Sequence, residues 1–432
     1  MAYVAEYLAF IRGFSRNAKL FIWFSALSSL AAGLTYVVLN LYFLRVGLQE
    51  GFLGGLVFYS SIAGVIFALP AGRASDHFGR RDALVVSGLV MVGGSLVQVL
   101  FPVPAMLVPA TFITGAAWVV SMVTGGPLLV ESSGREERAH LFGFQFALSM
   151  GIQVIGSNLG GLLPKFFAAL SGASPGDAGP LRATLLVGVA ILALSLLPLF
   201  LMERRHAGQA DRPAEPTAVF KLNLTNPGLV WRLILPQTIV SFGAGFVMPL
   251  QNVFMDRHLG ASAAQIGLIA GVGAILTGIG SLVAPIAARR WGKVRAVTVS
   301  QGASLPFLAL MGLVPNLGVY GGASLVRVAL MNLANPLISN FSLEVVDARE
   351  RATVNSLLNM CWSLGWAVSG WAGGWIMQNV SYTLPYAFTF TLYSIGIAAF
   401  YLFFRTYDPP LASLRSPEPE PDDRRKGLPA GE

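Results

Sequence analysis

The sequence holds little charge and a single cysteine. Only 12% of its 432 residues are charged, about half the share found in soluble globular domains, so an ordinary soluble domain is excluded. Cys361 has no partner for an intrachain disulfide. The sequence also has no His/Cys group with metal-ligand spacing, no phosphate-binding P-loop and no G-x-S-x-G nucleophile motif. These absences argue against an enzyme, and we predict no metal and no cofactor.

Hydrophobic residues make up 54% of the chain, and they gather in long runs. A run of about 20 apolar residues crosses a bilayer as a helix, and these runs are continuous, unlike the alternating strands of a membrane barrel. We therefore predict an all-α polytopic membrane protein with twelve transmembrane helices. The expected spans are residues 19–44, 51–70, 83–101, 104–130, 140–168, 181–202, 229–255, 262–286, 296–314, 317–342, 352–379 and 383–405.

The basic residues are distributed unevenly. With the N-terminus placed inside the cell, all but five of the 29 Lys and Arg residues fall in cytoplasmic segments. The exceptions are Arg45, Lys165, Arg182 and Arg257 in outer loops, and Arg327 within a span. This bias follows the positive-inside rule, so the net charge of +8 needs no nucleic-acid partner. We expect both termini in the cytoplasm and a bacterial inner membrane as the location.

Polar segments divide the chain. Residues 203–228 are polar and contain three prolines, which is typical of a linker. The expected organisation is an interfacial N-terminal segment at 1–18, six-helix bundles at 19–202 and 229–405, the cytoplasmic linker at 203–228 between them, and a cytoplasmic disordered tail at 406–432.

A constant offset of 213 residues relates the two halves. It aligns Gly47 with Gly260, Gly54 with Gly267, Gly79–Arg80 with Gly292–Lys293, Glu131 with Glu344, and Gly160–Gly161 with Gly373–Gly374. Single matches mean little in a chain with 48 glycines, but one offset that holds across four helices indicates a repeat. Parallel repeats of this kind are a transporter feature, so we predict two pseudo-symmetric bundles.

A short charged stretch joins the second and third expected spans. Its pattern, Gly72-x-x-x-Asp76-x-x-Gly79-Arg80-Arg81, resembles the signature loop of the major facilitator superfamily of secondary transporters. Twelve spans in two halves with a central linker resemble the family too, over about residues 19–405. His77 departs from the pattern, since the family usually has Arg or Lys there.

The resemblance implies a cytoplasmic gate, in which Asp76, Arg80 and Glu131 help to hold that side shut in the outward-facing state. A bundle that rocks between two states needs contacts that form in one state and break in the other. The alternative is an ordinary loop of solvated charges. The gate residues are Gly72, Asp76, Gly79, Arg80, Arg81 and Glu131 in the first half, and Arg289, Gly292, Lys293 and Glu344 in the second.

No acidic residue lies near the middle of an expected span, which weakens proton coupling through a central carboxylate. The basic residue Arg327 does lie near the middle of an expected span. Its span starts near Leu317, so Arg327 is about 15 Å deep, where a charge needs water or a partner. It is either a substrate contact that favours anions or carbonyl-rich molecules, or a structural group that caps the carbonyls of a broken helix.

Other polar side chains share helical faces within the spans. Asn355, Asn359, Trp362 and Trp366 lie on one face, which suits either a cavity for an aromatic or amphipathic molecule or packing between helices. Residues 156–161 loosely resemble the family's antiporter motif, although such glycines equally suit close packing. The predicted cavity residues are Tyr36, Asn40, Gln251, Arg327, Asn335, Asn355, Asn359, Trp362 and Trp366.

We therefore predict a secondary transporter that moves a small organic solute by alternating access, with proton-linked export of amphipathic compounds as the leading form. One alternative is an importer or uniporter of an organic anion or other metabolite recognised by Arg327. The other is a transporter-derived membrane sensor. The expected partners are the solute, the lipid bilayer and protons as the coupling ion, with a monomeric chain.

Overall fold

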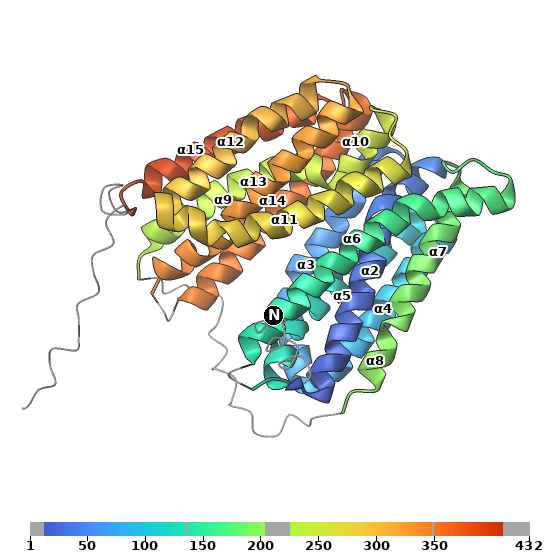
Figure 1. Ribbon diagram of the computed structural model, residues 1–432, viewed down its shortest axis with the longest axis horizontal. Coiled ribbons are helices and arrows are strands. Elements are labelled where there is room, and N and C mark those ends of the chain that lie inside the picture. Colours follow the sequence, from blue (N-terminus) through green and yellow to red (C-terminus); the bar gives the residue numbers. More distant parts are fainter. Residues whose placement is uncertain (1–12, 135–136, 204–224, 348–349, 409–432) are drawn as a thin grey trace, which may run out of the picture.

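The computed structural model describes residues 13–134, 137–203, 225–347 and 350–408, which form helices and connecting loops (Figure 1). The first half contains α2 (Arg16–Arg45), α3 (Glu50–Phe78), α4 (Arg80–Leu100), α5 (Pro104–Glu131), α6 (Arg138–Ser171), α7 (Ala178–Leu194) and α8 (Leu196–Phe200). The second half contains α9 (Pro227–Val247), the 3-10 helix η1 (Met248–Leu250), α10 (Gln251–Arg257), α11 (Ala263–Trp291), α12 (Lys293–Leu313), α13 (Leu317–Glu344), α14 (Arg351–Asn379) and α15 (Leu384–Phe404). Most of the expected N-terminal segment, linker and tail lies outside the described residues.

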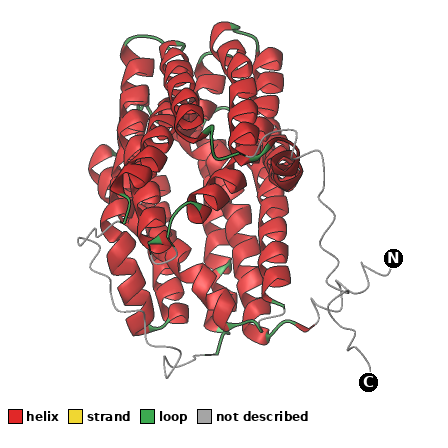
Figure 2. Cartoon of the chain, turned by 90° about the vertical axis from the view of Figure 1, so that its left-hand side faces the viewer, coloured by secondary structure: helices red, strands yellow, loops and turns green. Residues whose placement is uncertain are grey.

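Eleven helical segments in the described part of the chain are long and apolar enough to cross a membrane. A twelfth long helix, α14, has 29 residues, and polar side chains such as Asn355 and Asn359 lower its hydropathy. It packs along α3 and α9, and Figure 2 shows the long helices packed side by side. The protein is therefore an all-α polytopic membrane protein, as predicted.

The 213-residue offset reappears in the backbone. Gly47 and Gly260 have φ values of 94° and 66°, and Gly79 and Gly292 have values of 92° and 84°. Residues with a Cβ rarely adopt a positive φ, so glycine is required at both members of each pair. The two halves thus use the same turns at matching places, which supports the predicted pseudo-symmetry.

The charged stretch is more helical than predicted. α3 continues through Pro70 to Phe78 and α4 begins at Arg80, so Gly79 alone separates the two helices. The expectation that residues 71–82 form a loop is therefore wrong. A helix satisfies its own backbone hydrogen bonds on both sides of the membrane boundary, so a change from apolar to charged side chains does not end it.

The seventh expected span is broken rather than continuous. α9 ends at Val247, η1 covers Met248–Leu250, and α10 resumes at Gln251. Pro249 explains the break, because it has no backbone N–H and its ring clashes with the preceding turn of an α-helix. The break places irregular backbone inside the span, in protein surroundings where neighbouring side chains can bind the freed carbonyls.

The two halves lean together at one end and spread apart toward the other (Figure 1). We call the end that carries Gly79 and Gly292 the linker end, and the opposite end, which carries Arg45 and Asp256, the far end. The contact surface between the halves is called the seam.

Glycines allow the closest approaches at the seam. α3 crosses α14 at Gly54 and Gly374, where a Cβ on Gly54 would lie 3.1 Å from the Cα of Gly374. α6 crosses α11 at Gly161 and Gly267, where a Cβ on Gly267 would lie 3.1 Å from the Cα of Gly161. The 213-residue offset exchanges these two crossings, so the seam itself has pseudo-twofold symmetry.

Candidate functional site

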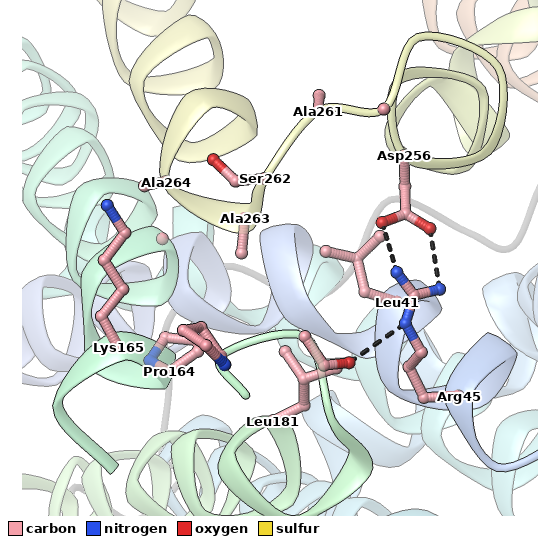
Figure 3. Close-up of a pocket in the computed structure, with 14 residues that line it drawn as sticks. Leu41, Arg45, Pro164, Lys165, Leu181, Asp256, Ala261, Ser262, Ala263 and Ala264 are labelled. Carbon is pink, nitrogen blue, oxygen red and sulfur yellow. Dashed lines mark hydrogen bonds and ion pairs between the residues drawn. The ribbon is translucent and has the colours of Figure 1, made fainter. Parts of the chain in front are cut away.

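An ion pair joins the halves at the far end (Figure 3). Arg45 Nη1 donates to Asp256 Oδ2 at 2.9 Å and Nη2 donates to Oδ1 at 2.7 Å, while Nε donates to the Gly176 carbonyl at 3.0 Å. The Asp256 side chain is only 8% exposed. Two parallel bonds in a partly desolvated place make a specific contact, and it borders a cavity of about 290 Å³ that Lys165 also lines.

A second polar group crosses the seam between α3 and the turn before α15. The Tyr382 hydroxyl donates to Glu50 Oε1 at 2.6 Å, and Arg257 Nε lies 3.8 Å from the same oxygen. The Gly51 backbone N–H donates to Gln378 Oε1 at 3.0 Å. Burial, and then the hydrogen bond to Glu50, raise the pKa of the Tyr382 phenol. Tyr382 therefore remains a donor at neutral pH.

Amide side chains continue the seam toward the middle of the molecule. Asn40 Nδ2 donates to Asn252 Oδ1 at 3.0 Å and to the Pro249 carbonyl at 3.2 Å, and Asn252 Nδ2 donates to the Tyr36 carbonyl at 3.1 Å. Asn40, which we predicted to line the cavity, thus ties α2 to the broken part of the seventh span.

Arg327 lies in a pocket of about 200 Å³ between the halves. It is 4% exposed, and its Nη2 donates to the Tyr393 hydroxyl at 3.1 Å. Its Nη1 lies 3.5 Å from Met248 Sδ, and its guanidinium carbon lies 5.4 Å from the Tyr393 ring centroid. The buried Nε has no hydrogen-bond partner. Among the described residues, no acidic side chain forms an ion pair with Arg327.

Both halves contribute to the Arg327 pocket. Tyr36 and Gln251, two predicted cavity residues, line it, together with Gln153 and Ser157 of α6. A buried cation with an unused donor is costly unless an acceptor arrives. The pocket is therefore chemically suited to an anion or a carbonyl group.

A second pocket, of about 390 Å³, lies wholly in the second half and nearer the linker end. Amide, hydroxyl, indole and aliphatic side chains line it, and none of them is charged: Gln237 of α9; Asn335, Ile338, Ser339, Ser342 and Leu343 of α13; and Val354, Asn355, Leu358, Asn359 and Trp362 of α14. We call it the amide pocket. Four predicted cavity residues meet here, whereas Trp366 packs against α9 at Gly245.

The predicted gate charges form one ion pair in each half. Arg80 Nη1 lies 3.0 Å from Glu131 Oε1, joining α4 to α5. Lys293 pairs with Glu344 and joins α12 to α13 in the same way. The 213-residue offset relates the two pairs, so each half carries a matching ion pair at the linker end. We call these two ion pairs, Arg80–Glu131 and Lys293–Glu344, the linker-end platforms.

The other predicted gate residues are arranged differently. Arg81 turns into its own half and donates to the carbonyls of Leu199 and Phe200 at 3.0 and 2.8 Å, so it caps the end of α8. Gly72 lies inside α3, and Arg289 is exposed in the last turn of α11. The side chain of Asp76 lies outside the described part of the structure.

Apart from Tyr36 and Asn40, the residues that bond across the seam were not among the predicted site residues. Arg45 and Asp256 carry opposite charges at the far ends of spans one and seven, which is the signal that was available. Gln153 and Gln237 lie in apolar spans, and no helical spacing marked them as pocket residues. Ser157 belongs to residues 156–161, which were predicted as a motif and not as part of a pocket.

The glycines that resemble an antiporter motif make packing contacts. A Cβ on Gly156 would lie 2.3 Å from the Leu30 carbonyl oxygen, and one on Gly160 would lie 2.7 Å from that of Leu34. α6 therefore packs directly on the backbone of α2, and these contacts account for the glycines without an export function.

Curated relatives match part of the chain. The uncharacterized MFS-type transporter YcaD of Salmonella arizonae is 32% identical over 102 residues, which is 24% of this chain and 26% of the relative. YcaD of Salmonella paratyphi B is 28% identical over 198 residues, which is 46% of this chain and 47% of the relative. The chain thus spans less than half the length of these relatives.

Solved transporter structures share the fold. The nucleoside transporter NupG superposes with a TM-score of 0.70 at 14% identity, covering 91% of this chain and 100% of that one. A bacterial homologue of the human lysosomal transporter Spinster, inward-facing and occupied, superposes with a TM-score of 0.69 at 16% identity, covering 90% and 96%. The family model described as Major Facilitator Superfamily matches residues 21–254 and 233–429. With this match over most of its length, the chain belongs to the Major Facilitator Superfamily.

Proposed function

We propose that the protein moves a small organic anion across the membrane by alternating access, and that Arg327 binds the anionic group. The observation that carries this proposal is the buried guanidinium, whose Nε is unpaired and which has no acidic partner among the described residues. A desolvated charge attracts an anion more strongly than a charge in bulk water does. The planar guanidinium also matches the two oxygens of a carboxylate.

The two halves supply the movement. The positive-inside charge bias favours a cytoplasmic linker end and cytoplasmic termini, in a bacterial inner membrane. In this orientation the joined far end is the outer side. The seam contacts of Arg45 and Glu50 must break when that side opens. We propose that the Arg80–Glu131 and Lys293–Glu344 platforms then meet the opposite half and close the linker end. Charged contacts suit this exchange, since separated partners are rehydrated.

Proton-linked export of an amphipathic compound is the second candidate. Met248, Met255 and Met311 line the Arg327 pocket, and flexible thioether side chains adapt to varied apolar shapes. Glu50 and Asp256 are the acidic residues at the seam whose contacts would break when the far end opens. Either carrier functions as a monomer, because each chain supplies both halves of the seam.

Flux through proteoliposomes that contain the full chain tests these candidates. Benzoate, benzyl alcohol and benzylamine share a ring and differ in charge. For the anion carrier, benzoate uptake saturates, shows counterflow and is lost in Arg327→Gln, whereas Arg290→Gln, at an exposed position, leaves it unchanged. Transport of benzylamine but not benzoate, accelerated by a pH gradient, would favour the second candidate. Binding without flux would identify a sensor and contradict both.

A further inference from the structure

We propose that the amide pocket is a second binding site, which takes an uncharged cyclic amide or imide. This second site is distinct from the proposed anion site, because it would recognise its ligand by a pattern of hydrogen bonds rather than by charge. Asn335, on its wall, follows Arg327 by eight residues on α13, which is about 12 Å along the helix axis. A solute that travels between Arg327 and the linker end passes close to it.

The lining of the pocket selects against charged ligands. Its eleven lining residues include four amides and two hydroxyls but no Lys, Arg, His, Asp or Glu. An ion that enters would gain no counter-charge from the lining. The volume of about 390 Å³ lies within the range of roughly 300–1,000 Å³ that is usual for small-molecule sites. A neutral polar molecule of modest size is therefore the matching class.

The amides offer paired donors and acceptors. Within the described residues, the side chains of Gln237 and Asn355 make no hydrogen bond. Asn359 Nδ2 donates to the Asn355 carbonyl at 2.8 Å, which leaves the Asn359 oxygen to accept. A side-chain amide places an acceptor beside a donor, so it pairs with the same arrangement on a ligand, as Asn and Gln do with adenine. The amide edge of a lactam or imide ring has this arrangement.

Trp362 adds a flat apolar wall. Trp362 is 37% exposed. Its backbone carbonyl accepts a hydrogen bond of 2.5 Å from Ser241 Oγ. That bond holds α14 against α9, so the indole and Gln237 keep a fixed relation. Indoles stack well on planar heterocycles. A planar ring with an amide edge can therefore stack on the Trp362 indole and form hydrogen bonds with the side-chain amides at the same time.

Equilibrium dialysis of labelled uracil with the full chain in nanodiscs tests this site. 1,3-Dimethyluracil keeps the ring and its carbonyls but has no N–H, so we expect it to bind about tenfold more weakly, the cost of about one hydrogen bond. Asn359→Leu and Gln237→Leu should each weaken uracil binding by about tenfold. The matched control is Asn379→Leu, on the same helix, whose amide makes the same kind of bond, to the Trp375 carbonyl at 2.9 Å, outside the pocket.

Arg327→Gln separates this proposal from the proposed function. Uracil affinity should change by less than about twofold in that variant, whereas anion transport is lost. A second readout does not depend on the leucine variants: in a Cys361→Ser background, uracil should slow alkylation of Ser339→Cys and not of Asn379→Cys. The proposal is overturned if uracil does not bind, if it binds no better than 1,3-dimethyluracil, or if it fails to protect position 339.

Discussion

Arg45 of α2 and Asp256 of α10 form a two-bonded ion pair across the seam, with N–O distances of 2.9 and 2.7 Å. The two residues end the first spans of the two halves, so their pairing reports directly on whether the far end is shut. With Asp256 only 8% exposed, removal of one partner leaves the other charge poorly solvated. In the proposed cycle, the pair is joined while the far end is shut and separates when that end opens.

The first prediction concerns this pair. Asp256→Asn removes the charge and one of the paired acceptors, so the far end should open more often. In a Cys361→Ser background, alkylation of Ala264→Cys, which lines the cavity beside the pair, should become several-fold faster. The exchange of the two charges, Arg45→Asp with Asp256→Arg, should restore part of the original rate.

The control for the first prediction is an exposed pair. Arg16 and Glu203 are 3.2 Å apart with side chains 67% and 70% exposed, and both belong to the first half. Exposed pairs contribute little, so Glu203→Gln should not change the alkylation rate. Equal rates in Asp256→Asn and the parent protein would remove the Arg45–Asp256 pair from the mechanism.

The second prediction concerns the glycine crossings. A Cβ on Gly54 would lie 2.6 Å from the Gly370 carbonyl oxygen, whereas one on neighbouring Gly55 would lie 4.0 Å from the Trp371 side chain. Gly54→Ala should therefore force the halves apart, at a cost of about 1–3 kcal/mol, and lower the thermal unfolding temperature. Gly55→Ala, one position away in the same helix, should not.

Symmetry extends the second prediction to the other crossing. A Cβ on Gly267 would lie 2.5 Å from the Ser157 carbonyl oxygen, and one on Gly273 would have its first contact at 3.9 Å. Gly267→Ala should match Gly54→Ala in effect, while Gly273→Ala should match Gly55→Ala. Thermal shift measurements on the four variants check this, and a destabilised Gly55→Ala would show that helix packing in general, not the seam, is being measured.

The repeat explains why much of the fold was predictable. Hydrophobic runs mark each span, and the offset that aligns Gly79 with Gly292 in the sequence also aligns their positive φ values in the structure. Local signals carry this information, because a turn that requires glycine requires it in any tertiary context. Pro249 was an equally local signal for the break in span seven.

The seam was less predictable because it depends on how two distant helices dock. Asn40 bonds with Asn252, and Gly51 with Gln378, and the helical spacing within a single span marks neither contact. The amide pocket could be predicted from the sequence only in part. The shared face of Asn355, Asn359 and Trp362 is visible in the helical spacing, but Gln237, which completes the pocket from α9, is not.

The third prediction concerns the linker-end platforms. Arg80→Ala and Lys293→Ala each remove one matching ion pair, and both should slow transport several-fold while membrane insertion stays normal. Asp76→Asn should act in the same direction. The control is Arg290→Ala at an exposed position. Flux per inserted molecule is the measurement, and full rates in both Arg80→Ala and Lys293→Ala would leave these charges as ordinary solvated groups.

The last prediction concerns Arg327 and the residue that orients it. Tyr393 accepts a hydrogen bond of 3.1 Å from Arg327 Nη2 and presents its ring 5.4 Å from the guanidinium carbon. Tyr393→Phe removes the hydrogen bond and keeps the ring, so it should weaken benzoate binding only modestly, by up to about tenfold. Arg327→Lys keeps the positive charge but loses the planar fork, so carboxylate binding should weaken further, while the preference for benzoate over benzylamine remains.

Arg327→Gln removes the charge itself, so it should abolish that preference and not merely weaken binding. The order expected for benzoate affinity is therefore parent, Tyr393→Phe, Arg327→Lys and then Arg327→Gln, measured by dialysis in nanodiscs. The differences in affinity between successive variants should be large, because Arg327 is only 4% exposed. Little solvent can therefore screen the side chain at this position. Similar affinities for all four proteins would assign Arg327 to packing against Tyr393 and Met248, and would end its role as the anion-binding group.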